Sequence, residues 1–564
     1  MKASFLRNIF IYLFIIVAAL PLNAKDVHIY ASSITGDFTT VLRSKLQNLT
    51  WNDHVVLDFN KAGTYEINGT VRCSANIEIK GVSKEKTTII LNKGTDKANF
   101  KAFTDDTFLE AQGTPEHQIE VSIHDISIKL KDHQGIWWDN SAMYAVKIYH
   151  ACKVNIEHVN SYLRNAVCTN FDLRVCSNVT IKGCNITNYN NCAAGGNIWI
   201  RGATKNVEIS DNKVYKYGND EMVAFFEATD NAHTHHRGHV TRENINVENN
   251  TFSYGYDSKK GKNDIINDLL FSFITVDEDV KVNNFGCASK NVRLSNNTFE
   301  INDPCKITMI LGFTEEDSHQ NIVVEDNIFE NNENYSGKKY THEDFLVKDF
   351  SKNRNTISIN NNTVTNNCAL VNSWGGAGNY FALIRGGNIS MEGNTITDNA
   401  PISNLTKETL GTILLWCGSQ GGSAKLSGNE VKGLKMLACV SEGDGIEKFS
   451  ITAQNNYFEG DTRIYCNKVK HLDLNFSENT FVSTQYDFFL QEFANEGTLV
   501  FSNNNVTAQK GGQLMTHWSN TPLSSMRFTK LEVSGNTFSG VKQSELMQNI
   551  QSSEKRNARY NTFK

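Results

Sequence analysis

Apolar and polar residues alternate along most of this chain, and each alternating segment ends in a short repeated signal. The signal is an Asn, one variable residue and a large apolar residue, as in Asn297-Thr298-Phe299. The preceding segments, such as Val292-Arg293-Leu294, have the two-residue period of a β-strand, not the 3.6-residue period of a helix. The recurring Asn residues are Asn212, Asn250, Asn297, Asn327, Asn362, Asn394, Asn429, Asn456, Asn479, Asn504, Asn536 and Asn561.

The spacing between successive signals predicts a coiled fold. Neighbouring signal Asn residues lie 23 to 47 positions apart, so the shortest separation defines one turn and the excess is inserted loop. Repeats of this length bury their apolar faces by stacking on one another. We therefore predict one all-β solenoid of short parallel strands.

A recurring Asn has a mechanical role in such a solenoid. Its side-chain amide both donates and accepts, so each Asn can bond the equivalent residues of the coils above and below. Asn also tolerates the left-handed backbone conformation at a corner between strands. With this ladder from Asn212 to Asn561, the chain resembles the right-handed parallel β-helix proteins of the pectate-lyase-like superfamily. The resemblance covers about residues 70 to 564 and implies a fold, without singling out an enzyme family.

The start of the chain predicts an exported protein. Residues 1–24 contain Lys2 and Arg7, an apolar run and a small-residue ending at Ala24, which is the pattern of a cleaved signal peptide. The run is too short for a convincing membrane span, and no second candidate follows. We expect residues 25–68, which lack the repeat, to cap a β-helix formed by residues 69–564. The predicted location is secreted or periplasmic.

Earlier coils carry the same apolar frame without the Asn. Ile126, Val159 and Cys184 occupy the position in the coil that the signal Asn takes later, so we expect apolar stacking to change to stacking of amides at Asn212. Four cysteines follow at eight-residue intervals: Cys168, Cys176, Cys184 and Cys192. That interval fits strand positions in a core, whereas paired zinc ligands lie two to four residues apart. We therefore predict buried free thiols.

Net charge narrows the choice of partner. Cleavage after residue 24 removes Lys2 and Arg7 and no acidic residue, so the balance of 55 basic to 61 acidic residues becomes 53 to 61, or −8. A nucleic-acid-binding protein usually has the opposite sign. The chain has no heptad pattern that would support a trimer, and we expect a monomer.

A second set of aligned strands carries charged residues at outward positions. They are Lys147, Arg201, Glu227, Lys348 and Arg385. Alternate side chains of a strand point to opposite sides, and neighbouring coils lie about 4.8 Å apart, so we expect these residues on one face. A slip of one residue in this alignment would invert the face.

The longest insertions, on either side of Asn250, add further candidates. The first holds a histidine- and arginine-rich segment with His235, His236, Arg237, His239 and Arg242. Arg matches carboxylate or sulfate groups of a sugar polymer, and His serves as acid or base near neutral pH. The segment also fits a solvated loop, and its spacing lacks a recognisable metal-ligand frame. Upstream, Trp137 and Trp138 are candidates either to stack on sugar rings or to pack within the protein.

The resemblance implies an activity class. Lyases of this fold remove the proton beside a uronate carboxylate, using a cation or Ca²⁺ to neutralise that carboxylate and a base to take the proton. We predict a polysaccharide lyase that cleaves an acidic polysaccharide by β-elimination. Its candidate catalytic residues are Lys147, Arg201, His235, His236, Arg237, His239 and Glu227. Substrate-binding candidates are Trp137, Trp138, Arg242, Lys348 and Arg385, and Asp220 and Glu221 are candidate metal ligands if Ca²⁺ takes part.

Two alternatives remain open. A glycoside hydrolase on the same scaffold would use Asp220, Glu221 and Glu227 as paired carboxylates, although the Gly-His-Gly turn of polygalacturonases is absent. A non-catalytic carbohydrate-binding or surface protein would need none of these groups. A fold alone does not choose among the three functions.

Overall fold

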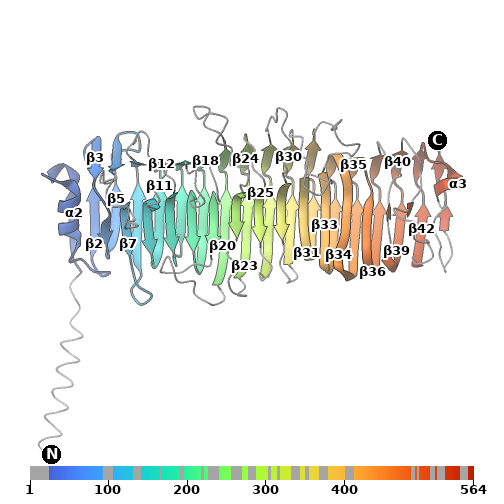
Figure 1. Ribbon diagram of the computed structural model, residues 1–564, viewed down its shortest axis with the longest axis horizontal. Coiled ribbons are helices and arrows are strands. Elements are labelled where there is room, and N and C mark those ends of the chain that lie inside the picture. Colours follow the sequence, from blue (N-terminus) through green and yellow to red (C-terminus); the bar gives the residue numbers. More distant parts are fainter. Residues whose placement is uncertain are drawn as a thin grey trace, which may run out of the picture.

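The computed structural model shows a parallel β-helix, which confirms the predicted fold class. Strands of successive coils stack side by side along the long axis of the molecule, between helices α2 (Phe38–Leu46) and α3 (Gln543–Leu546) (Figure 1). In the described part of the chain, the 45 strands belong to one hydrogen-bonded sheet, in which the pairings are parallel. The structure describes residues 24–92, 106–130, 142–164, 167–189, 196–217, 222–226, 240–255, 270–276, 287–302, 307–313, 318–331, 343–349, 355–366, 379–399, 412–483, 490–491, 494–508, 515–516, 527–546 and 557–564.

Each coil contributes up to three strands, and equivalent strands stack into three series. Series 1 contains the strands that the sequence alignment of outward charges relied on. Its members are β4 (Val71–Cys73), β7 (Asp106–Gln112), β10 (Ala142–Tyr149), β13 (Val167–Arg174), β16 (Ile198–Arg201), β19 (Val223–Phe226), β22 (Leu270–Val276), β25 (Ile307–Phe313), β28 (Glu343–Asp349), β31 (Asn379–Glu392), β33 (Thr412–Ser427), β34 (Glu430–Gln454), β36 (Ile464–Ser477), β38 (Leu490–Gln491) and β41 (Met515–Thr516).

Series 2 follows series 1 within each coil, and the long strands β31, β33, β34 and β36 continue from one series into the other. Its further members are β1 (Asp26–Tyr30), β2 (His54–Asp58), β5 (Asn76–Lys80), β8 (Ile119–His124), β11 (Ala151–Glu157), β14 (Val179–Lys182), β17 (Thr204–Ser210), β20 (Val240–Glu248), β23 (Cys287–Ser295), β26 (Ser318–Glu325), β29 (Asn355–Asn360), β39 (Ala494–Ser502), β42 (Arg527–Ser534) and β44 (Asn557–Arg559).

Series 3 begins after the corner that carries the Asn signal, and β34 joins it through its first residues. Its further members are β3 (Gly63–Ile67), β6 (Thr87–Leu91), β9 (Ser127–Leu130), β12 (Asn160–Arg164), β15 (Asn185–Tyr189), β18 (Lys213–Tyr217), β21 (Thr251–Tyr254), β24 (Thr298–Ile301), β27 (Ile328–Asn331), β30 (Thr363–Asn366), β32 (Thr395–Asp398), β35 (Tyr457–Gly460), β37 (Thr480–Ser483), β40 (Asn505–Ala508), β43 (Thr537–Ser539) and β45 (Thr562–Phe563).

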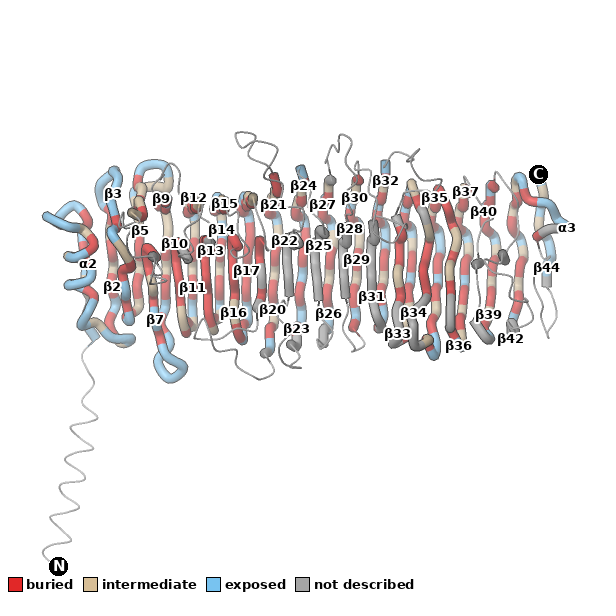
Figure 2. The backbone as a smooth tube through the Cα atoms, viewed as in Figure 1, coloured by how far each residue is buried: buried red, intermediate tan, exposed pale blue. Residues whose placement is uncertain are grey.

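The core runs through the centre of the coils, because every second strand residue points inward. In series 2 the register aligns Ile181 with Ile209, Val247 and Leu294, all of them fully or almost fully buried. Buried positions alternate with more exposed ones along the strands of Figure 2. Stacking like on like at a spacing of about 4.8 Å gives continuous apolar columns.

The Asn signal forms a buried ladder along these columns, as predicted. The Nδ2 of each Asn donates to the Oδ1 of the next, from Asn212 to Asn250 at 2.9 Å through to Asn536 and Asn561 at 3.0 Å. The same Oδ1 also accepts the backbone N–H of the preceding Asn, and the Nδ2 donates a second bond to a carbonyl of the coil before. The amides therefore satisfy buried backbone groups at this corner of each coil from Asn212 onward.

The left-handed conformation falls one residue earlier than the sequence suggested. The residue before each ladder Asn has a positive φ, for example Asp211 at 58° and Asn249 at 57°, whereas the ladder Asn residues do not. This explains why Asn, Asp or Gly usually occupies that preceding position, since these residues adopt positive φ at the lowest cost.

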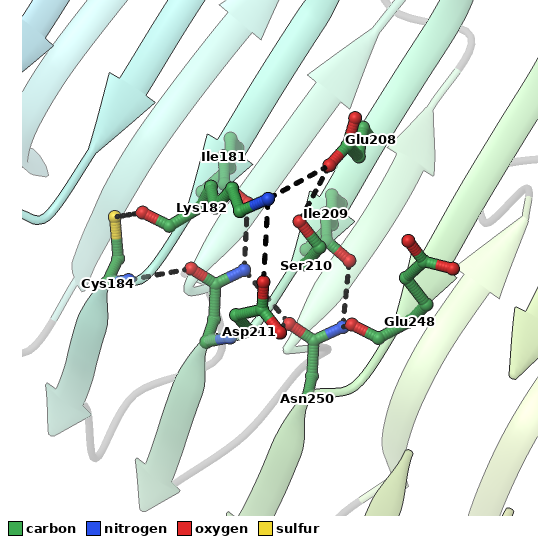
Figure 3. A network of polar contacts seen from close by, with 10 residues as sticks. Ile181, Lys182, Cys184, Glu208, Ile209, Ser210, Asp211, Glu248 and Asn250 are labelled. Carbon is green, nitrogen blue, oxygen red and sulfur yellow. Dashed lines mark hydrogen bonds and ion pairs between the residues drawn. The ribbon is translucent and has the colours of Figure 1, made fainter. Parts of the chain in front are cut away.

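The change from apolar to amide stacking occurs where the sequence placed it. Ile126 and Val159 are buried at the ladder phase, and Cys184 accepts a weak contact from the Val159 N–H at 3.5 Å. The backbone N–H of Cys184 then donates to Oδ1 of Asn212 at 2.9 Å, which starts the ladder. Figure 3 shows Cys184 and Asn250, the two hydrogen-bond partners of Asn212 on either side of it. Cys168, Cys176 and Cys184 are buried free thiols, as predicted, and Cys192 lies outside the described residues. Burial raises the pKa of the Cys176 and Cys184 thiols to about 12.

Helix α2 packs on the first coils at the N-terminal end. Asp37 caps it by accepting the Thr40 N–H at 2.8 Å, and Leu42 and Leu46 are buried. Arg43 donates to the carbonyl of Thr70 at 2.8 Å and so fastens the helix to β4. Parallel pairing already begins between β1 and β2, earlier than residue 69. Among the described residues, no helix is long and apolar enough to cross a membrane.

We predict that Asn362→Ala destabilises the fold by about 2–5 kcal/mol, because it leaves buried hydrogen-bonding groups of both neighbouring coils without a partner. Oδ1 of Asn362 accepts two bonds from Asn327, and its Nδ2 donates to Val324, Asn360 and Asn394. Chemical denaturation measures the change. The control is Asn388→Ala, an exposed amide without a positive φ that accepts one bond from Ser423, and this change should cost about 1 kcal/mol or less. Equal losses in the two variants would contradict the role given to the buried ladder.

Candidate functional site

A charged cluster lies on the outer face of series 1, on the three consecutive strands β10, β13 and β16. Val146 and Ile148 of β10 are buried in the core, so Lys147 and Tyr149 point outward from the coil. The register pairs Lys147 with Asp172 and Trp199, and pairs Tyr149 with Arg174 and Arg201. Two adjacent rows of outward residues thus bring Lys147, Asp172, Arg174 and Arg201 together; we call these four residues the basic cluster.

Asp172 is the centre of the basic cluster. One carboxylate oxygen accepts bonds from Nη2 and Nε of Arg174 at 2.7 and 3.1 Å, and the other lies 2.9 Å from Nε of Arg201. Asp172 and Arg174 are 0% and 1% exposed, and the Arg201 side chain is 13% exposed. Arg201 is therefore the member of the ion-paired group that solvent reaches most readily.

An aromatic ring covers each of the three cations. Nζ of Lys147 lies 4.0 Å from the ring centroid of Tyr144, and the guanidinium carbon of Arg201 lies 4.4 Å from that of Trp199. Arg174 lies 5.1 Å from the centroid of Tyr149. Attraction to a ring face compensates part of the hydration that a buried cation loses. The rings therefore help to hold three like charges in neighbouring coils.

The cluster has an excess of positive charge, since three cations and one carboxylate leave a formal charge of +2. Glu110 pairs with Lys147 in the register, but its carboxylate also contacts Arg72, at 3.4 Å. An excess of cations with few water molecules around them is suited to bind an anion. Its donor set does not fit a calcium ion, which requires several oxygen ligands.

Electrostatics keep Asp172 ionised. Burial by itself would raise the pKa of its carboxyl, but the attraction of Arg201 and Arg174, the Arg174 hydrogen bonds and the charge of Lys147 together lower it below the ordinary value. Burial likewise opposes the charge of Arg174, yet Asp172 raises the pKa of this guanidinium above its usual range. Asp172 is thus suited to orient the two arginines and unsuited to donate a proton.

Sequence reasoning named Lys147 and Arg201 and missed the two residues between them. The segment Phe171-Asp172-Leu173-Arg174 alternates apolar and charged residues at the same phase as Lys147, so the strand pattern could have identified it. Its ion pair could not be inferred, because the partner of Arg201 lies one coil away.

The other predicted residues of series 1 do not join the cluster. Successive pairings put Lys348 of β28 in the row of Lys147, six coils along, about 29 Å away. Leu383 of β31 is the register partner of Lys348, and Arg385 lies two residues after it. Arg385 is therefore in the row of Arg201, but five coils further on, about 24 Å along the axis. The sequence alignment placed Lys348 and Arg385 in the correct rows, but both residues lie too far along the solenoid to contact the basic cluster.

Arg242 does not lie in an inserted loop, as the sequence suggested, but on β20 of series 2. Its side chain is 0% exposed, and it pairs in register with Thr204 and Ser289, which are also buried. This placement argues against direct contact with a polymer. The remaining candidates lie outside the described residues: Trp137, Trp138, Asp220, Glu221, Glu227, His235, His236, Arg237 and His239. Among the described side chains, no group of three His, Cys, Asp or Glu residues could hold a metal ion.

Comparisons with known proteins bear on the fold alone. No protein-family model and no curated protein sequence matches the chain. Solved structures with a similar backbone include the catalytic domain of a GH87 α-1,3-glucanase in complex with tetrasaccharides, at 13% identity and a TM-score of 0.37, covering 78% of this chain and 70% of that one. A family 6 polysaccharide lyase specific for mannuronic acid, from human gut microbiota, is 11% identical with a TM-score of 0.29, covering 94% and 91%. A pectate lyase is 11% identical with a TM-score of 0.26, covering 80% and 79%.

We predict that Asp172→Asn destabilises the protein at pH 7 by about 3–5 kcal/mol, because it leaves Arg174 and Arg201 without their shared counter-ion. The folded-state pKa of Asp172 lies below its unfolded value of about 3.9, so its contribution is present above that pH and is lost as the pH falls through the folded pKa. The gap in unfolding free energy between the variant and the wild type should therefore shrink only below about pH 4.

Denaturant titrations between pH 7 and pH 3 measure this gap. Glu447→Gln is the control, since Glu447 pairs with Lys470 on the exposed surface and should have little effect at any pH. A pH-independent gap for Asp172→Asn would show that the loss is steric and not electrostatic.

Proposed function

We propose that this protein is a secreted polysaccharide lyase, which cleaves a uronic-acid-containing polysaccharide by β-elimination. The observation that carries the proposal is the charge of +2 on the basic cluster, held on the outer face of a rigid scaffold in a chain that is acidic overall. Positive charge that is held in one place attracts anions and raises their local concentration. A uronate carboxylate is an anion of the appropriate size, and an Arg guanidinium can bind it through two parallel N–H···O hydrogen bonds in a bidentate geometry.

The chemistry assigns different tasks to the members of the cluster. In β-elimination a base removes the proton beside the carboxylate, the glycosidic C–O bond breaks, and the electron pair forms a carbon–carbon double bond while the leaving oxygen takes up a proton. Cations beside the carboxylate stabilise the negative charge that develops in this step. We assign that contact to Arg201, the most exposed member, and we assign Asp172 and Arg174 to hold its guanidinium in position.

Lys147 adds a further positive charge to the cluster. Its ammonium rests against the ring of Tyr144 and the residue is 2% exposed, so we assign it to charge stabilisation and not to proton removal. The proposal retains His235 and His236 as candidates for the proton acceptor, because a neutral imidazole accepts a proton near neutral pH.

The assay is incubation of the mature protein with a panel of acidic polysaccharides while the ultraviolet absorbance of an unsaturated uronate is followed. We expect a rise with at least one polymer, and a fall in kcat/KM of about 100-fold in Arg201→Ala, as for other losses of a charge-stabilising donor. Arg201→Lys should recover part of the activity. His235→Ala and His236→Ala test the proton acceptor.

The matched control is Arg293→Ala, which removes an exposed arginine of series 2 that pairs with Glu325, and it should retain full activity. New reducing ends without absorbance would indicate hydrolysis and overturn the lyase assignment. The absence of both signals across the panel would favour a non-catalytic carbohydrate-binding protein.

A further inference from the structure

A shallow groove of about 610 Å³ lies on the outer face of series 2, on the four coils that contain β11, β14, β17 and β20. The corner at His150 separates this face from the face of the basic cluster. The groove is lined by Lys153, Asn155, Asn178, Val179, Thr180, Asn206, Val207, Glu208, Asn244 and Asn246. None of these residues was a candidate in the sequence, and the proposed lyase chemistry uses none of them.

Two rows of polar side chains run along the groove. One row is an exposed amide ladder in which Asn206 donates to Asn178 at 2.8 Å and Asn244 donates to Asn206 at 3.0 Å. Each of these three residues has a positive φ, which a short amide side chain tolerates. The sequence conceals this ladder because its members lack the Asn signal. Two further steps, through Asn291 and Asn321, continue it beyond the groove.

The second row pairs Asn155, Thr180, Glu208 and Asn246 in register. Oδ1 of Asn246 is a buried acceptor without a hydrogen-bond partner in the described part of the chain. An acceptor that is left unsatisfied costs the free protein about 1–3 kcal/mol. The row therefore offers amide, hydroxyl and carboxylate groups, one in each coil.

Charge and shape narrow the class of ligand. Lys153 and Glu208 are the charged residues of the lining and their formal charges cancel, in contrast to the basic cluster. Backbone N–H and C=O groups of these strands are used between coils, so the groove offers no free strand edge to a peptide. Its polar groups repeat about every 4.8 Å over three inter-coil steps, about 14 Å in all, and the groove is open to solvent.

We propose that this groove binds a neutral, hydroxyl-rich polysaccharide chain lying along the axis of the β-helix. Sugar hydroxyls both donate and accept, so they match the amides and the threonine hydroxyl of the two rows. Along the first row a repeating polymer meets an amide in each of three successive coils. This proposal does not depend on the lyase activity, because the groove and the basic cluster share no residue.

Affinity gel electrophoresis of the full-length mature protein tests the groove. The probes are hydroxyethylcellulose, xyloglucan and galactomannan, with polygalacturonate as the acidic comparison. Thr180→Trp fills the groove, and Thr452→Trp is its matched control, since Thr452 lies further along the same outward row and is exposed. We expect at least one neutral polymer to retard the wild type and Thr452→Trp, with an association constant at least 10-fold lower for Thr180→Trp.

Asn246→Leu gives a second, independent outcome. It replaces an amide of the groove lining by an apolar side chain, so we expect weaker retardation by the neutral polymer. It also removes the unsatisfied buried acceptor, so we expect a higher Tm, which shows that unfolding does not cause the weaker retardation. Arg201→Ala should leave retardation by neutral polymers unchanged, which separates this proposal from the proposed function. The groove proposal is overturned if no neutral polymer retards the protein, or if Thr180→Trp and Thr452→Trp are retarded equally.

Discussion

The hydrogen bond between stacked Asn side chains is the interaction on which the coils from Asn212 onward depend, and buried apolar and thiol side chains occupy the same position in the coils before it. Every coil turns a corner at which backbone groups lie inside the protein, away from water. The buried ladder satisfies them through Oδ1 and Nδ2 of one residue per coil, from Asn212 to Asn561. Because each amide bonds the next, the ladder also sets the register of the strands on either side of it. Fixed register in turn aligns the outer faces of neighbouring coils.

Aligned outer faces allow distant parts of the sequence to form local chemistry. Lys147, Asp172 and Arg201 come from three successive coils and meet because their strands stack in register. Buried charges of one sign are costly, and the structure compensates them with a shared carboxylate and an aromatic ring for each cation. The same register places amides, a hydroxyl and balanced charges on the next face, where the groove lies. One scaffold therefore presents two faces of different charge.

Local pattern was sufficient to predict the fold, since strand alternation and the Asn signal repeat in every coil. It also placed the start of the ladder, the buried thiols and the outward direction of Lys147 and Arg201. Pattern could not supply the number of coils between two residues, so Lys348 and Arg385 were grouped with a site that lies about 24–29 Å away. Nor could it show that Arg242 is buried or that Asp172 joins two arginines, because burial and ion pairing depend on contacts between coils.

The central claim is that the basic cluster recognises a uronate through its charge. Isothermal titration calorimetry with a uronic-acid oligosaccharide, and with the same oligosaccharide after reduction of its carboxyl groups, tests this most directly. Reduction removes the negative charge and keeps the hydroxyl pattern. The account predicts that the wild type binds the acidic oligosaccharide and binds the reduced form at least 10-fold more weakly. It also predicts that Arg201→Ala binds the two oligosaccharides with equal affinity. Equal affinity of the two ligands for the wild type would contradict it.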